Sequence, residues 1–377
     1  MKHSLFYISI LFFILSSTLQ ACIWDSDTLK FESEGLPSVV DTIGGRFKKL
    51  PDSYYQFRID RLKKQKVLSL FDYDDLAVAY DRVGNSKQAI ETILLKETLD
   101  KSNFSVGERD DIHYKTLANL GTFQVHLWFR QSLNDRDDSL LDQSIDNLTK
   151  AIVINPNAHF GREKVQLNLI KWMRNNPLLT DASTINQLVP VDFLNQSQDS
   201  RKLLEALQGL VVLGEAWDSP DVFIMMSVLL QNIYKKHLSA LAKLRAIELI
   251  KSDKALLLPN EIDKKDLIKL LEDNLGISEN SISIVETEYQ SIRKHGDSYR
   301  AALTQYVNKQ ITLEKHPDIN VREFWKDFQE PTPYIMKETI ESTYSEGSIL
   351  EYSLLVLLFI LGMLILKSLK DMILKAH

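Results

Sequence analysis

Apolar residues recur at the three- and four-residue spacing of amphipathic helices along most of the chain between residues 53 and 330. One long stripe predicts a single helix in which Gly296 is a candidate kink, and it consists of Val285, Tyr289, Ile292, Tyr299, Leu303 and Val307. We find no convincing stretch of alternating apolar and polar residues in this region, and no Asn-Gly hairpin turn. The pattern therefore predicts an all-α fold.

Two further apolar stretches lie near the ends of the chain and lack a polar face. The first runs from about Leu5 to Leu15, follows the basic residues Lys2 and His3, and precedes the small residue Ala21. A basic start, an apolar centre and a small residue before the cut form the layout of a secretory signal peptide. We therefore predict export of the chain.

The residue after this segment is Cys22, the only cysteine of the 377 residues. Leu19, Ala21 and Cys22 stand at the −3, −1 and modified positions of a bacterial lipoprotein lipobox, which the segment resembles, although Gln20 fits it loosely. The resemblance implies cleavage before Cys22 and a membrane lipid on its thiol. The alternative is a chance cysteine in a signal peptide that is cut elsewhere. Without a second cysteine the chain forms no intramolecular disulfide.

The second apolar stretch covers residues 349–366, and residues 353–366 carry no charge. Eighteen helical residues span roughly 27 Å, at the lower limit for crossing a bilayer. Acidic residues precede the stretch and lysines follow it, so the positive-inside rule places the C-terminus in the cytoplasm. The stretch predicts a transmembrane helix, with a buried core helix as the alternative.

Residues 73–93 and residues 114–156 each carry small and large residues at a similar characteristic spacing, and we call each stretch a unit. A third unit begins at residue 159. In the first unit the set is Tyr73, Leu76, Ala77, Tyr80, Gly84, Ala89 and Ile93. The spacing resembles the tetratricopeptide repeat (TPR), a family of stacked helical hairpins. The resemblance implies a TPR-like helical-hairpin solenoid, followed by further helical modules and the single C-terminal transmembrane helix. Residues 201–330 are either degenerate repeats or an unrelated helical module.

These patterns divide the chain into predicted segments. They are a signal peptide (1–21), a tether (22–52), TPR-like repeats (53–178), a linker (179–200), a helical module (201–330), a membrane-proximal linker (331–348), the transmembrane helix (349–366) and a cytoplasmic tail (367–377).

The composition and motifs favour binding over catalysis. The net charge is −6, and no strongly basic region that would bind nucleic acid occurs. The chain lacks a His-Glu-x-x-His motif, a phosphate-binding glycine loop and a nucleophile elbow. With one cysteine, a zinc–thiolate site is excluded. We therefore predict no catalytic residue, no metal, no cofactor and no small-molecule substrate.

The TPR resemblance implies a groove in which the first helices of successive units bind a peptide. The groove residues carried over from the family pattern are Asp74, Arg82, Lys115, Asn119, Phe123 and Lys171. Lys115 and Asn119 occupy positions that hold a peptide's terminal carboxylate and main chain in some members of the family. Lys164 stands where such clamps place an asparagine, so the clamp is incomplete.

Together these features predict a membrane-anchored adaptor that binds other proteins or peptides of a bacterial cell envelope. Its predicted place is the inner membrane, with the helical body in the periplasm and the C-terminus in the cytoplasm. Two alternatives remain, namely a structural tether within the envelope and an unrecognised enzyme within 201–330.

Overall fold

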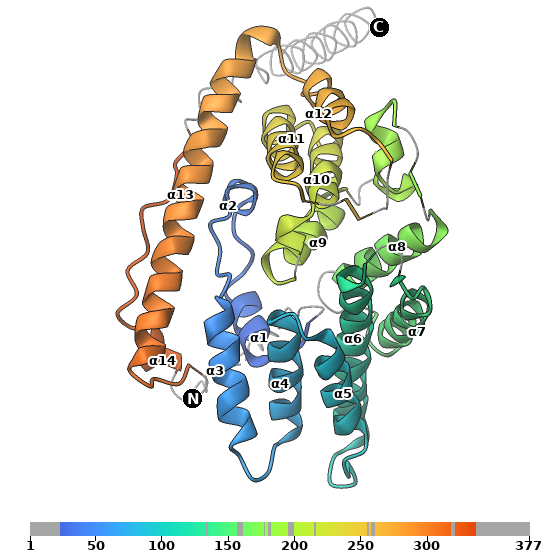
Figure 1. The fold of residues 1–377 in the computed structure, drawn as a ribbon, viewed down its shortest axis with the longest axis vertical. Helices are drawn as coiled ribbons and strands as arrows, with labels where there is room; N and C mark the ends of the chain where they lie inside the picture. The colour runs from blue at the N-terminus through green and yellow to red at the C-terminus, as the bar shows by residue number, and fades with distance from the viewer. Residues whose placement is uncertain are drawn as a thin grey trace, which may run out of the picture. The chain divides into compact units, whose positions relative to one another are not determined.

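The computed structural model describes residues 23–336, apart from 133–134, 157–160, 177, 180–181, 195–199, 215, 255, 258–260 and 318–320. The described residues form fourteen α-helices and no β-strand (Figure 1). In chain order the helices are α1 (Ser26–Ser33), α2 (Val39–Gly44), α3 (Asp52–Lys63), α4 (Leu70–Arg82), α5 (Ser86–Glu97), α6 (Val106–Arg130), α7 (Ser139–Ile154), α8 (Arg162–Asn175), α9 (Ser200–Val212), α10 (Pro220–Asn232), α11 (Lys236–Lys251), α12 (Lys264–Asp273), α13 (Glu279–Thr312) and α14 (Val321–Trp325). Short 3₁₀ helices occur at Ile185–Leu188, Val191–Phe193 and Ala216–Asp218.

The all-α part of the predicted fold class is confirmed, and its membrane-spanning part requires correction. No helix among the described residues combines the length and the apolar character needed to cross a bilayer. The predicted transmembrane helix, 349–366, lies outside the described residues. The described residues are therefore all-α, and the transmembrane part of the predicted fold class is not supported. The helices belong to one compact unit that ends at Thr332.

Successive helices pack as hairpins joined by short turns. The pairs α4–α5, α6–α7 and α10–α11 each pack along their length. Side-chain caps define where two of the first helices begin: Ser69 and Asp72 form a capping box at α4, and Ser105 and Glu108 form one at α6. At 25 residues α6 is much longer than α4, so the second hairpin extends beyond the first.

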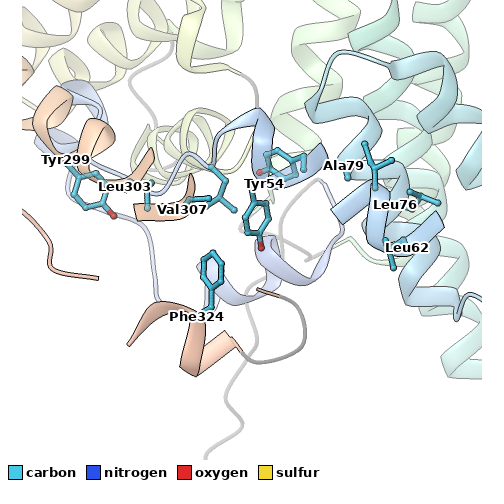
Figure 2. Close-up of a cluster of buried hydrophobic side chains, with 11 residues drawn as sticks. Tyr54, Leu62, Leu76, Ala79, Tyr299, Leu303, Val307 and Phe324 are labelled. Carbon is cyan, nitrogen blue, oxygen red and sulfur yellow. The ribbon is translucent and has the colours of Figure 1, made fainter. Parts of the chain in front are cut away.

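Helix α13 confirms the long apolar stripe predicted from the sequence. It is 34 residues long, and all six stripe residues are buried. The helix packs against α2, α3 and α11, so residues near the end of the described chain contact residues near its start (Figure 1). Figure 2 shows part of this contact, in which Tyr299, Leu303 and Val307 meet Tyr54 and Phe324. Burial of such a cluster favours folding by roughly 25 cal/mol per Å² of apolar surface.

Gly296 is needed for close packing and lies within an uninterrupted helix α13. A Cβ atom at position 296 would lie 2.0 Å from the carbonyl oxygen of Gly44, which is the last residue of α2. Arg293 donates a hydrogen bond to the same carbonyl. The absence of a side chain at position 296 therefore allows α2 to rest directly on α13.

This contact gives the first stability prediction. Gly296→Ala should lower the free energy of unfolding by about 3 kcal/mol, because backbone atoms of α2 cannot yield without separating from α13. Gly107→Ala is the matched control, since a Cβ there meets no atom within 4 Å, and it should leave stability unchanged or raise it by up to about 1 kcal/mol. Urea unfolding followed by circular dichroism measures both. Equal effects of the two substitutions would contradict the proposed packing role.

The structure differs from the tether predicted over 22–52. This stretch carries the short helices α1 and α2, and it buries Trp24, Ile43 and Phe47 within the helical body. Its helices are too short to show a periodic pattern, since eight and six residues cover only about two turns each.

Candidate functional site

Four of the predicted groove residues lie together on α4 and α6. Lys115, Asn119 and Phe123 follow one another at four-residue spacing, which places them on one face of α6. Asp74 faces them from α4, and its carboxylate lies 3.4 Å from the Asn119 side-chain amide. We call this set, together with Asp75 of α4, the α4–α6 site. All five residues are buried.

The α4–α6 site is occupied by the chain's own residues Ile23, Trp24, Asp25 and Ser26, which we call the N-terminal segment. The Trp24 amide donates a hydrogen bond of 2.7 Å to Asn119 Oδ1, and Asn119 Nδ2 donates one of 3.1 Å to the Trp24 carbonyl. One side chain thus pairs with both main-chain groups of one residue. This recognition depends on the peptide backbone and not on the identity of the side chain.

The Trp24 side chain is anchored beside this pairing and is 1% exposed. Its ring meets the ring of Tyr114 edge to face, with centroids 5.4 Å apart. Lys115 Nζ lies 4.6 Å from the centre of the same ring, within the range of a cation–π interaction, and is also bonded to Asp111 at 2.6 Å. Ile23 packs on Phe123 and on the small residues Ala77 and Ala89.

A buried ion pair between Lys96 and Asp74 holds part of the α4–α6 site in place. Lys96 of α5 donates to both carboxylate oxygens of Asp74, each at 2.8 Å, and both side chains are almost fully buried. Burial raises the pKa of Asp74 to about 6, while Lys96, Lys115 and Asn119 act in the opposite direction. The bonds fix the Asp74 carboxylate so that it accepts from the Asn119 amide and orients it toward Trp24.

A second carboxylate of α4 holds the other end of the N-terminal segment. Asp75 accepts from the Ser26 amide at 2.8 Å and from the Ser26 hydroxyl at 2.8 and 3.0 Å. Arg58 of α3 lies nearby and pairs with Asp25 at 3.1 Å and Asp27 at 2.7 Å. Burial raises the pKa of Asp75 to about 6, with a further rise from Asp25 and an opposing effect of Arg58.

The raised pKa of Asp75 predicts a pH-dependent effect of its replacement. Between about pH 4 and pH 6 the folded protein holds the Asp75 proton more tightly than the unfolded chain does, so the contribution of Asp75 to wild-type stability falls as pH rises. Asp75→Asn keeps an acceptor for Ser26 but carries no charge. We expect it to match wild type near pH 4 and to be more stable by about 2 kcal/mol above pH 6. The exposed Asp110→Asn, measured in parallel by urea unfolding at both pH values, should show no such difference.

Two predicted groove residues lie elsewhere. Arg82, at the end of α4, donates to the carbonyls of Leu213 and Gly214 after α9. Lys171 lies exposed on α8. Cys22, the predicted lipidation site, is outside the described residues. Arg82 therefore joins α4 to the residues that follow α9.

Sequence reasoning missed the residues that fill and support the site. The missed residues are Trp24, Ser26, Asp75, Lys96 and Arg58. Of the adjacent acidic residues Asp74 and Asp75, only Asp74 was a predicted groove residue, and both are buried and bonded. The apolar pair Ile23-Trp24 within an otherwise polar stretch was the available signal.

Charged groups in the later helices mainly pair with one another. Glu248 of α11 bonds Arg293 at 2.9 Å and Arg245 at 2.9 Å, and His237 lies 2.6 Å from Glu288. Within the described ranges, no group of three or more His, Cys, Asp or Glu side chains has the arrangement needed to hold a metal ion.

Comparison with known proteins did not extend the TPR resemblance. No protein-family model, curated protein or solved structure matches this chain.

Proposed function

We propose that this protein is a non-catalytic adaptor that binds a peptide segment of a partner protein in the α4–α6 site. The supporting observation is the double hydrogen bond between Asn119 and the main chain of Trp24. Any peptide segment offers the same N–H and C=O pair, so a partner segment with a large apolar residue fits where Trp24 lies. Binding requires release of the N-terminal segment.

Because the N-terminal segment occupies the α4–α6 site, a partner peptide must compete with it in order to bind. Because it belongs to the same chain, its effective concentration at the site is high. The apparent affinity of a partner is reduced by the fraction of molecules in which the segment has left the site. A partner therefore competes only when its own contacts exceed those of Trp24 and Ser26.

We further propose that the hairpins α4–α5 and α6–α7 are TPR units, and that Cys22 carries a lipid in a bacterial cell envelope. Cys22 is joined directly to Ile23, so about 3.8 Å separates their Cα atoms. A lipid there would hold the α4–α6 site next to a membrane surface. Radioactive palmitate should label the wild-type protein in its host and leave Cys22→Ala unlabelled; equal labelling of both would refute the lipid at this residue.

A peptide-binding experiment tests the adaptor proposal directly. The probe is a fluorescent synthetic peptide of residues 23–33, and the protein is the full chain. Trp24→Ala should bind the peptide measurably more tightly than wild type, because its own segment competes less well. Adding Asn119→Ala should remove most of this gain, since the main-chain pairing is lost.

The control replaces an asparagine outside the site. Asn168 lies exposed on α8, so Asn168→Ala added to Trp24→Ala should leave peptide binding unchanged. If Trp24→Ala remains folded by circular dichroism and binds the peptide no better than wild type, the α4–α6 site does not accept peptides from outside. Identical binding with and without Asn119→Ala would exclude the main-chain pairing as the basis of recognition.

A further inference from the structure

A separate feature of the molecule is a mostly apolar cavity between α6, α8, α9 and α10. Its volume is about 340 Å³, within the range of roughly 300–1,000 Å³ found for small-molecule sites. Val125 and Phe129 of α6 line it together with Ile170 and Met173 of α8, and Ile23 completes the wall. The cavity is therefore lined in part by the N-terminal segment, which the α4–α6 site holds in place.

Most charged side chains of the cavity wall are already paired with protein groups. His126 and Arg130 both bond Asp81, at 2.6 and 2.8 Å, and Asp218 bonds Lys254 at 2.9 Å. Arg136 differs from them. Its guanidinium carbon lies 4.0 Å from the centre of the Trp128 ring, its Nε has no hydrogen-bond partner among the described residues, and no carboxylate of those residues lies within ion-pair distance. Asp138 acts on Arg136 only at longer range, and a cation at the wall of an apolar cavity that no carboxylate bonds directly favours an anionic ligand.

A buried acceptor in the same wall also lacks a donor. Gln166 is 8% exposed, and its Nε2 donates to the Thr122 hydroxyl at 3.1 Å. That hydroxyl donates to the Ala118 carbonyl, so it must accept from Gln166, and this fixes the orientation of the amide. Gln166 Oε1 then has no hydrogen-bond partner among the described residues, and the same holds for Ser219 Oγ. Buried polar atoms without partners are uncommon in folded proteins and are satisfied by a ligand or by water.

We propose that this cavity binds a diffusible amphipathic carboxylate with a single alkyl chain. The chain lies against the apolar walls, and the carboxylate pairs with the Arg136 guanidinium. A hydroxyl on the ligand, or a water molecule held with it, donates to Gln166 Oε1. Because Ile23 forms one wall, a bound ligand also favours the docked position of the N-terminal segment. This inference goes beyond the proposed adaptor function and does not depend on it.

The charge distinguishes a free carboxylate from an acyl chain carried on Cys22. An acyl group in ester or amide linkage has no charge at its head and offers the Arg136 guanidinium no ion pair. A free carboxylate supplies the charge and both oxygens for a two-point contact with the guanidinium. The observations therefore favour the diffusible ligand.

Isothermal titration calorimetry of the full chain tests the proposal, with dodecanoate below its micelle-forming concentration and dodecanol below its solubility limit. We expect dodecanoate to bind about tenfold more tightly than dodecanol. Arg136→Gln should weaken dodecanoate binding about tenfold and leave dodecanol binding within twofold of wild type. Arg136 is only partly buried, so this variant is expected to fold. Arg322→Gln, on the remote helix α14, is the matched control and should change neither affinity.

Two further variants complete the test. Leu169→Trp fills the cavity and should weaken binding of both compounds at least tenfold, provided circular dichroism shows a wild-type helical spectrum. The proposal is overturned if dodecanoate fails to bind wild type, or if Arg136→Gln binds it as well as wild type does. Binding by Cys22→Ala but not by wild type would also overturn it, because the chain's own acyl group would then be the occupant.

Discussion

Arg58→Met is expected to lower the free energy of unfolding by about 3–5 kcal/mol. The Arg58 side chain is fully buried and bonds Asp25, whose side chain is 2% exposed, as well as Asp27. It also donates to the hydroxyl of Tyr54, which itself bonds Asp27. Methionine has similar length but no charge, so the variant leaves buried carboxylates without a counterion. Desolvation of an unpaired charge dominates the loss.

A rescue variant separates charge from packing in this cluster. Adding Asp25→Asn and Asp27→Asn to Arg58→Met removes the uncompensated charges, so much of the lost stability should return. Lys63→Met, at the exposed end of α3, is the matched control and should change stability by less than about 0.5 kcal/mol. Chemical denaturation at neutral pH measures all variants. If Arg58→Met is no less stable than the control, the ion pairs do not fix the N-terminal segment.

The sequence predicted long helices well because their burial repeats over many turns. Helix α13 has a stripe of six buried residues. Over 34 residues the helical spacing repeats often enough to be distinguished from a chance pattern. Lys115, Asn119 and Phe123 came instead from the TPR resemblance, and they lie on one face of α6 because residues four apart in a helix lie one above another. Their proximity to Asp74 followed from the family pattern.

What occupies the α4–α6 site could not be predicted in this way. Trp24 and Asn119 are 95 positions apart, and a pairing over that distance leaves no local pattern in the sequence. Helices α1 and α2 are too short for periodicity, so the stretch resembled a tether. The contacts of Asp74 with Lys96 and of Asp75 with Ser26 could not be predicted either, because both partners come from other elements. Tertiary contacts decide these positions.

Trp24→Ala is the second substitution with a large expected effect. Truncating a fully buried tryptophan usually costs about 3–5 kcal/mol, from lost contacts and from the cavity that remains. Here the ring touches Tyr114 and Lys115, and it lies beside the Asn119 pairing. We expect urea unfolding to show a loss in this range, with Trp172→Ala, a partly exposed tryptophan of α8, as a milder control.

The size of that loss also tests whether the N-terminal segment behaves as part of the core or as a bound peptide. When the segment can leave the site while the helices stay folded, the global loss cannot exceed the free energy of its docking. Hydrogen exchange at the Trp24 and Ser26 amides reports docking, and circular dichroism reports the helices. Fast exchange at these amides while the helical circular dichroism is unchanged indicates a released segment, which the adaptor proposal requires. A full loss with both probes changing together indicates a permanent core element, because the site then never opens to a partner.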